Sequence, residues 1–162
     1  MVGLQVIDTP GLLDHPLEER NTIEMQSITA LAHIRACVMF IVDISEQCGY
    51  TIEQQSQLCK SIKPLFANKP LIVAFNKTDV KKVEDLGEDD RKIIEELADL
   101  SAESLGKERE IWAMSTMTDD NVMKVRNTAC DALLQHRVEQ VRQERDRSLV
   151  CCTMMMTIIL SG

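Results

Sequence analysis

The sequence predicts an α/β fold with a mostly parallel sheet and flanking helices. Short apolar runs rich in β-branched residues alternate along the chain with longer segments whose apolar residues recur at helical spacing. Such alternation is typical of parallel strands joined by right-handed crossover helices. The 162 residues suit one domain, and 44% of them are hydrophobic, so a substantial core is available.

The predicted strands are short and apolar. Residues 37–43 form a continuous apolar run of the kind found in strands buried on both faces. Further strands are expected at residues 2–8, 70–75 and 111–114. Because parallel strands end at the same edge of a sheet, the polar residues that follow these runs should lie near one another.

The predicted helices occupy residues 21–35, 51–66, 89–105 and 119–147. Asp119 or Asp120 is expected to cap the last helix, which is long and polar. The acidic stretch 84–90 is expected to be a solvated loop. Spacing predicts that the core-facing residues of the two middle helices are Ile52, Leu58, Ile62, Leu65, Ile93, Ile94, Leu97 and Leu100.

The composition limits the classes of partner. A net charge of -8 does not attract phosphate backbones through the overall field. Contact between ribosomal RNA and the arginines of the last helix stays open as a local alternative. The six cysteines form no CxxC pair, so buried, reduced thiols are expected. No signal peptide and no apolar run of about 20 residues is present, so no membrane span is expected.

The first predicted strand ends in Asp8, Thr9, Pro10 and Gly11. A carboxylate at a strand tip can hold Mg²⁺ through water. A glycine lets a backbone N–H approach a phosphate without a Cβ in the way. These four residue types also make ordinary turns, so the motif alone is weak.

The third predicted strand ends in Asn76, Lys77, Thr78 and Asp79. Guanine presents two donors, N1–H and the 2-amino group, that Asp79 could accept together, and adenine lacks that pair. Asn76 could bond the other edge of the base or tie neighbouring loops together. The stem of Lys77 could lie over the base plane. An ordinary turn is again the alternative.

The fourth predicted strand runs into Ser115 and Thr116, which are small enough to let a backbone N–H reach the guanine carbonyl. This signal is weak alone. Together, however, the three clusters occur at strand tips in order along the chain, which chance rarely produces.

The combined motifs resemble those of the translation-factor-related P-loop GTPases, and among them the Obg-related nucleolar GTP-binding proteins. Residues 8–14, 18–24 and 42–51 carry the closer likeness, which covers roughly residues 1–145. The resemblance implies a Ras-like GTPase domain, with GTP or GDP and Mg²⁺ as cofactors. It further implies that the protein is located in the nucleus and nucleolus. It also implies a role in assembling the large (60S) ribosomal subunit, with the pre-60S particle as partner.

The resemblance assigns roles to individual residues. Asp8 would contact Mg²⁺ through water, the N–H of Gly11 would sense the γ-phosphate, and residues 9–20 would form a switch. Leu12 stands where Ras-like GTPases place a water-orienting glutamine, which implies slow turnover. The residues implied to read guanine are Asn76, Lys77 and Asp79, with Ser115 and the N–H of Thr116 in support.

The sequence departs from the family pattern in two places. It contains no G-x-x-x-x-G-K-[ST] loop and no first switch, which argues against hydrolysis by this chain alone. In the related fold, the missing first strand lies between the strands at 2–8 and 37–43. We therefore expect a gap with two unpaired edges, and a marginal fold.

The chain is expected to comprise a truncated GTP-binding domain, residues 1–147, and an apolar tail, residues 148–162, unlike the family's continuation. The tail could be fortuitous, an aggregation-prone strand or, less readily, a membrane contact. Two functions remain open. One is a guanine-nucleotide switch for ribosome assembly, present as a fragment. The other is a non-catalytic interaction module that has lost nucleotide binding.

Overall fold

The structure is a computed structural model that describes residues 5–8, 33–145 and 155–160. Its strands are β1 (Gln5–Asp8), β2 (Ala36–Asp43), β3 (Leu71–Asn76), β4 (Trp112–Ala113) and β5 (Met155–Leu160). Its helices are α2 (Ile52–Ile62), α3 (Glu88–Leu105) and α4 (Val122–Arg145), with the short 3₁₀ turns η2 (Lys63–Phe66) and η3 (Val83–Asp85). Most of the helix expected at 21–35 lies outside the described residues.

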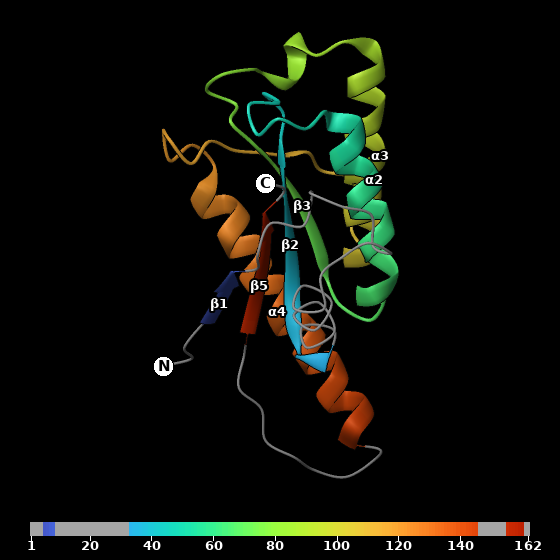
Figure 1. Cartoon of the computed structure of the whole chain (residues 1–162). Coiled ribbons are helices and arrows are strands. Elements are labelled where there is room, and N and C mark those ends of the chain that lie inside the picture. Colours follow the sequence, from blue (N-terminus) through green and yellow to red (C-terminus); the bar gives the residue numbers. More distant parts are fainter. Residues whose placement is uncertain (1–4, 9–32, 146–154, 161–162) are drawn as a thin grey trace.

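The predicted α/β fold class is confirmed. The strands form one sheet of order β1–β5–β2–β3–β4, in which every strand pairing is parallel. Figure 1 shows α2 and α3 on one side of this sheet and α4 on the other. The central strands are therefore covered on both faces, as their continuous apolar sequences require.

The core has two layers, one on each face of the sheet. Successive residues of β2 and β3 contribute to one layer and then to the other. Val38, Phe40 and Val42 face α2 and α3, where they meet Ile52, Ile62, Ile94 and Leu97. Cys37 and Met39 face α4, where they meet Ala129 and Leu133. This period of two puts successive side chains on opposite faces of the sheet.

Helix α2 begins with a capping box, in which Thr51 Oγ1 accepts from Gln54 N–H and the Gln54 side chain accepts from Thr51 N–H. The helix ends earlier than predicted because Pro64 cannot continue the α-helical ladder. The following 3₁₀ turn places Phe66 in the core at 4% exposure, whereas Leu65 is 40% exposed. The prediction that Leu65 faces inward was wrong.

Helix α3 is tied to the start of β3 by hydroxyl groups. Ser101 Oγ donates to Leu71 O at 3.2 Å, and Leu71 N–H donates to Ser104 Oγ at 2.8 Å. The helix ends where Gly106 adopts a left-handed conformation with φ of 61°. The acidic residues of 84–90 are on the surface, but residues 88–90 form the first turn of α3, where negative charge is favourable, rather than a loop.

Helix α4 begins at Val122, so the residue that precedes it is Asn121 rather than Asp119 or Asp120. Asn121 has a φ of 54°, and its side chain donates to Ala113 O at 3.1 Å. The prediction that Asp119 or Asp120 caps this helix was therefore wrong. The two aspartates belong to the turn between β4 and the helix.

The open gap expected between the first two strands is absent from the described sheet. Strand β5, from the apolar tail, lies between β1 and β2 and pairs in parallel with both. Figure 1 shows β5 in this position. The expectation of two unpaired edges was wrong because a strand from a distant part of the chain lies between β1 and β2. The order of the local motifs along the sequence could not predict this pairing.

The four described cysteines are free, which agrees with the expectation of reduced thiols. Cys37 and Cys59 are buried, and burial raises the pKa of each thiol to about 12. Such thiols are poor nucleophiles at neutral pH. Cys48 and Cys130 are only partly buried. Within the described ranges, none of the helices has the length and apolarity that a membrane span requires.

Candidate functional site

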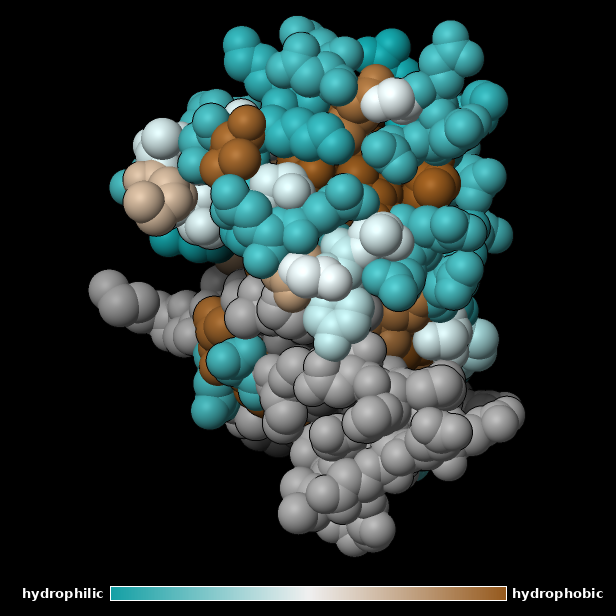
Figure 2. All heavy atoms as spheres, turned by 45° about the horizontal axis from the view of Figure 1, so that its top comes forward, coloured by the Kyte–Doolittle hydropathy of each residue, from teal (hydrophilic) through white to brown (hydrophobic). Residues whose placement is uncertain are grey.

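The carboxyl ends of the parallel strands meet at one edge of the sheet, which we call the carboxyl edge. There β2 ends at Asp43 and β3 at Asn76, which are register partners, and Ser115 and Thr116 follow β4. Strand β1 ends earlier, at Asp8, which is level with Met39 of β2 through Ile158 of β5. The loops that follow β2 and β3 lie at the top of Figure 1, and Figure 2 shows that this part of the surface is mainly hydrophilic. Polar groups from separate strands are thus gathered in one place, as parallel topology predicts.

Asn76 joins the tip of β3 to the loop after β4. Its Oδ1 accepts from Thr116 N–H at 3.1 Å, and its Nδ2 donates to Thr116 Oγ1 at 3.3 Å. Below these contacts, Thr78 N–H donates to Met114 O at 3.3 Å. Of the roles considered for Asn76, these contacts match the one in which it ties neighbouring loops together. They also occupy the Thr116 N–H that was expected to support guanine.

Asp79 projects from the same loop and is held by one hydroxyl. Its Oδ1 accepts a hydrogen bond from Ser115 Oγ, while the residue as a whole is exposed. Ser115 is itself only 1% exposed. A carboxylate whose direction is set by a buried group, but whose oxygens face solvent, is well prepared to accept two parallel donors from a planar ligand.

Ser115 also organises the loop that carries it. Its Oγ accepts from Met117 N–H and Thr118 N–H, both at 3.3 Å. Its backbone N–H donates to Asp120 O at 3.1 Å. One buried hydroxyl therefore fixes both the loop after β4 and the carboxylate after β3, so the two halves of the predicted base site are coupled.

Lys77 adopts a left-handed backbone conformation with φ of 67°. Its Nζ lies 2.6 Å from Asp43 Oδ2, at the tip of the neighbouring strand β2. The Lys77 side chain therefore crosses from β3 towards β2, and its ammonium is anchored away from Asp79. Because only 32% of the side chain is exposed, it can form a wall of the site through its methylene stem.

Asp43 is a site residue that the motif search missed. Its Oδ1 accepts from Ser45 N–H and Ser45 Oγ, and its Oδ2 accepts from Cys48 N–H as well as from Lys77. Burial raises the pKa of Asp43, but the hydrogen bonds from Lys77, Ser45 and Cys48 lower it by more, so the pKa lies below its usual value. An Asp two residues before a Ser at a strand tip is the turn signal that could have found it.

Gln55 holds the backbone of Asp43 in place through two hydrogen bonds. It is completely buried on α2, where its side chain accepts from Asp43 N–H at 2.8 Å and donates to Asp43 O at 3.0 Å. A second contact of Nε2, to Tyr50 O at 3.1 Å, closes the loop between β2 and α2. Helix α2 thus positions the Asp43–Lys77 pair through one amide.

Asp8 ends β1 and is exposed, but it is level with Met39 of β2, so the structure does not bring it beside Asp43 and Asn76. The other members of its motif, Thr9, Pro10, Gly11 and Leu12, lie outside the described residues, so their predicted roles stay predictions. No group of three or more potential metal ligands occurs among the described residues. A single carboxylate such as Asp8 could hold Mg²⁺ only through water, with phosphate and further waters completing the shell.

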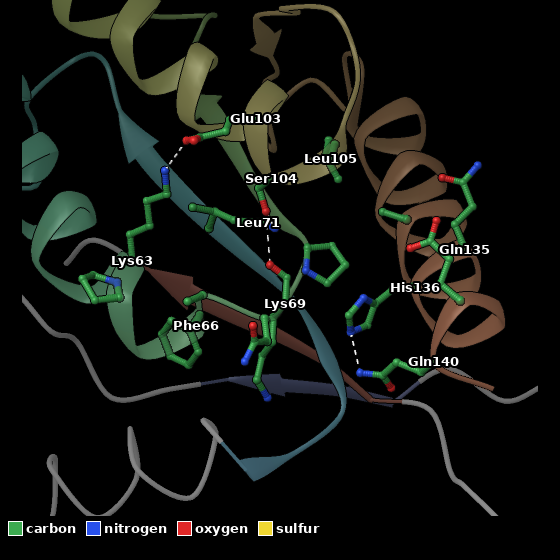
Figure 3. Close-up of a pocket in the computed structure, with 16 residues that line it drawn as sticks. Lys63, Phe66, Lys69, Leu71, Glu103, Ser104, Leu105, Gln135, His136 and Gln140 are labelled. Carbon is green, nitrogen blue, oxygen red and sulfur yellow. Dashed lines mark hydrogen bonds and ion pairs between the residues drawn. The ribbon is translucent and has the colours of Figure 1, made fainter. Parts of the chain in front are cut away.

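A cavity of about 840 Å³ opens at the opposite edge of the sheet, where β3 begins and α3 ends. Figure 3 shows its lining, which includes the Lys63–Glu103 ion pair and the His136–Gln140 hydrogen bond. Burial lowers the pKa of His136; Glu139 opposes this shift and Lys69 adds to it. None of the residues predicted to bind nucleotide lines this cavity, so it is separate from the carboxyl edge.

Comparison with known proteins agrees with this geometry. A family model described as Nucleolar GTP-binding protein 1 (NOG1) matches residues 22–79. The chain is 58% identical over 136 residues to a probable nucleolar GTP-binding protein 1 of Dictyostelium discoideum, and 57% identical over 136 residues to the nucleolar GTP-binding protein 1 of Drosophila melanogaster. Each alignment covers 84% of this chain and 20% of the relative, so the chain spans about a fifth of their length.

A solved structure supports the same assignment. The crystal structure of a nucleolar GTP-binding protein 1 from Plasmodium falciparum superposes with a TM-score of 0.67 at 42% identity. The match covers 86% of this chain and 69% of that chain. Sequence motifs, sheet topology and both kinds of comparison therefore lead to one conclusion: this chain belongs to the nucleolar GTP-binding protein 1 family.

Proposed function

We propose that this chain binds guanine nucleotides by reading the base at the carboxyl edge, as part of a GTPase that acts in assembly of the large (60S) ribosomal subunit. The observation that carries the proposal is the linked arrangement of Asn76 and Asp79 after β3 with Ser115 and Thr116 after β4. These contacts hold a carboxylate and an amide at the open end of a parallel sheet, where ligands of such folds bind.

Base recognition follows from the chemistry of Asp79. Guanine N1–H and its 2-amino group are adjacent donors, and a carboxylate accepts both in parallel. Adenine offers an acceptor at N1 and no 2-amino group, so the carboxylate would be desolvated without a partner. The hydrogen bond from Ser115 Oγ keeps Asp79 in place before the ligand arrives, which reduces the ordering cost of binding.

Phosphate and metal binding rest on the residues after β1. Asp8 would hold Mg²⁺ through water, and Mg²⁺ would neutralise phosphate charge there. The backbone N–H of Gly11 would face the γ-phosphate. Because the sequence lacks the Lys-containing phosphate loop of the family, we propose that the base supplies most of the affinity of this chain and that hydrolysis by it alone is negligible.

The cellular part of the proposal comes from the relatives, whose names describe nucleolar proteins. We place this chain in the nucleus and nucleolus, with the proteins and RNA of the pre-60S particle as partners. Sedimentation of the tagged chain on a sucrose gradient tests this, because a partner of that particle moves with the 60S precursors and leaves them at high salt. A chain that stays at the top of the gradient at every salt concentration would contradict this part.

A second function is favoured by one observation. Strand β5 occupies the place between β1 and β2 that the resemblance assigns to the strand before the phosphate loop. A chain arranged in this way could act as a protein-interaction fragment without nucleotide. The two functions differ in a single measurable property, which is saturable binding of guanine nucleotide.

The deciding experiment is a titration of the purified chain with fluorescent GDP, followed by competition with GTP and ATP. Micromolar binding that GTP displaces and ATP does not supports base recognition. The matched control is Asp131→Asn, which removes one charge from an exposed position on α4 and should leave binding unchanged. No saturable binding by a chain with a cooperative unfolding transition would leave only the interaction function.

A further inference from the structure

The space between β1 and β2 in the sheet is filled by one strand, β5, which pairs with both neighbours. On one side, residues 155–158 of β5 pair in register with residues 5–8 of β1. On the other side, residues 155–160 pair with residues 36–41 of β2. Thr157 stands at the middle of this arrangement, with Ile7 and Val38 as its two register partners.

With β5 in place, the β2 side of this interval is buried. Ala36, Cys37, Val38 and Phe40 are each at most 1% exposed. In a parallel strand, the N–H and C=O groups point alternately to the two neighbours, so β3 can satisfy only part of those on β2. Without a strand on the other side, the remainder would form an unpaired sheet edge beside newly exposed apolar side chains, which a further strand can pair and cover.

The sequence of the occupant suits the position. Residues 155–160 read Met-Met-Thr-Ile-Ile-Leu, with three successive β-branched residues and no charge, proline or glycine. This composition favours strands and is typical of parallel strands covered on both faces. The match does not depend on the family, whose resemblance ends near residue 145.

Strand β1 depends on this occupant more than β2 does. Strand β2 also pairs with β3, whereas β5 is the one strand neighbour of β1 in the described sheet. The connection between β1 and the guanine-reading strands therefore passes through β5. Asp8, at the end of β1, is aligned with Ile158 and through it with Met39 of β2, so it lies four residues short of Asp43 at the carboxyl edge.

We propose that the interval between β1 and β2 is an acceptor site for one apolar, parallel strand, and that residues 155–160 of this chain are its occupant. Insertion of this segment attaches β1, and with it Asp8, to the guanine-reading strands. Withdrawal releases β1 and leaves β3, β4 and α3 in place. The proposal is independent of nucleotide binding.

Amide hydrogen exchange of the full chain tests the proposal, with Thr157→Pro as the disrupting variant and Thr157→Val as its matched control. Proline removes an N–H and fixes φ away from the strand value, whereas valine keeps the strand. In Thr157→Pro, exchange in residues 155–160 and 5–8 should quicken at least about tenfold, while residues 71–76 and 94–101 change less than about threefold. The proposal fails if residues 155–160 are unprotected in the parent chain, or if residues 5–8 keep their protection in Thr157→Pro.

A crosslinking measurement decides the matter if Thr157→Pro unfolds the whole chain. The parent chain receives Val6→Cys together with Met156→Cys, which are register partners, and Val6 is accessible at 53% exposure. The control pairs Val6→Cys with Thr157→Cys, which is one residue out of register with Val6. A short bifunctional thiol reagent should link the first pair within one chain, as peptide mapping detects. Equal linkage of both pairs, or linkage of neither, would overturn the proposal.

Discussion

Two regions of the sheet lie on either side of β5, and they are built differently. On one side lie β2, β3 and β4; the residues proposed to bind guanine follow β3 and β4, and residues 36–40 of β2 are at most 5% exposed. On the other side, β1 is short and Val6 is 53% exposed. The first region is joined by α2 and α3 between consecutive strands, whereas the second is held by a strand from the far end of the chain.

This difference separates the two parts of the proposed chemistry. Base reading is located where neighbouring strands and a buried hydroxyl fix the groups, so it should tolerate changes in the β1 region. Metal and phosphate binding is proposed for the residues after β1, so it should depend on whether residues 155–160 are inserted. Each of the following predictions tests this separation.

The largest effect is expected from Asp79→Asn, compared with Asp8→Asn. The amide at position 79 can no longer accept both guanine donors, so GDP should bind about 100-fold more weakly. Xanthosine diphosphate, which has a carbonyl in place of the 2-amino group, should gain affinity because the amide can donate to it. Titration with the fluorescent nucleotides measures both changes.

Asp8→Asn changes a carboxylate in the same way in the other region and should alter the Kd for GDP less than about threefold in the absence of Mg²⁺. Equal losses in the two variants would show that base reading and the β1 region act as one unit, against the separation.

A smaller effect is expected on stability, when a valine is replaced by alanine separately on each side of β5. Val38→Ala removes two buried methyl groups from the core and should lower the free energy of unfolding by about 2 kcal/mol. Val6→Ala changes an exposed strand and should lower it by less than about 0.5 kcal/mol. Urea denaturation followed by circular dichroism measures both values. A Val6→Ala loss as large as that of Val38→Ala would mean that β1 belongs to the main cooperative core.

The smallest effect is expected from the Asp43–Lys77 pair. The pKa of Asp43 is depressed in the folded chain, so its stabilising contribution is present above the unfolded pKa of about 3.9 and is lost as pH falls through the lower folded value. Asp43→Asn should therefore cost about 1 kcal/mol at neutral pH. Its difference from the parent should shrink below about pH 4.

The pH dependence is measured as urea midpoints of both chains at several pH values between pH 3 and pH 7. A difference between parent and variant that stays constant across this range would show that the charge of Asp43 adds nothing to stability.

Sequence reasoning located the central elements because their signals are local. The run at 37–43 and the periodic segment at 89–105 differ from β2 and α3 by one residue at their starting ends. Burial on both faces makes β2 apolar throughout, and one buried face gives α3 its helical period. The meeting of Asn76 and Asp79 with Ser115 and Thr116 followed from the shared carboxyl edge of parallel strands.

Other features were not predicted from the sequence because they arise from competition between local effects. Pro64 changes an α-helix into a 3₁₀ turn, and the altered period exchanges Leu65 for Phe66 in the core. Asp43 was given no role of its own at the site, because its partners Lys77 and Cys48 come from different loops. The turn from Ser115 to Asn121 uses positive φ values at Asp119 and Asn121, which delays the start of α4.

The sequence by itself determined the fold class, the order of β2, α2, β3, α3 and β4, and the strand tips that carry the guanine motif, because hydrophobic period and turn residues act over short distances. Only the tertiary structure decided the neighbour of β1. The unpaired polar edge of buried β2 must be satisfied, and an apolar segment can do this from anywhere in the chain, since the entropy of closing a loop grows only slowly with its length. The place of residues 155–160 is therefore set by a vacancy in the sheet and by their strand-forming composition, rather than by any motif that adjoins them.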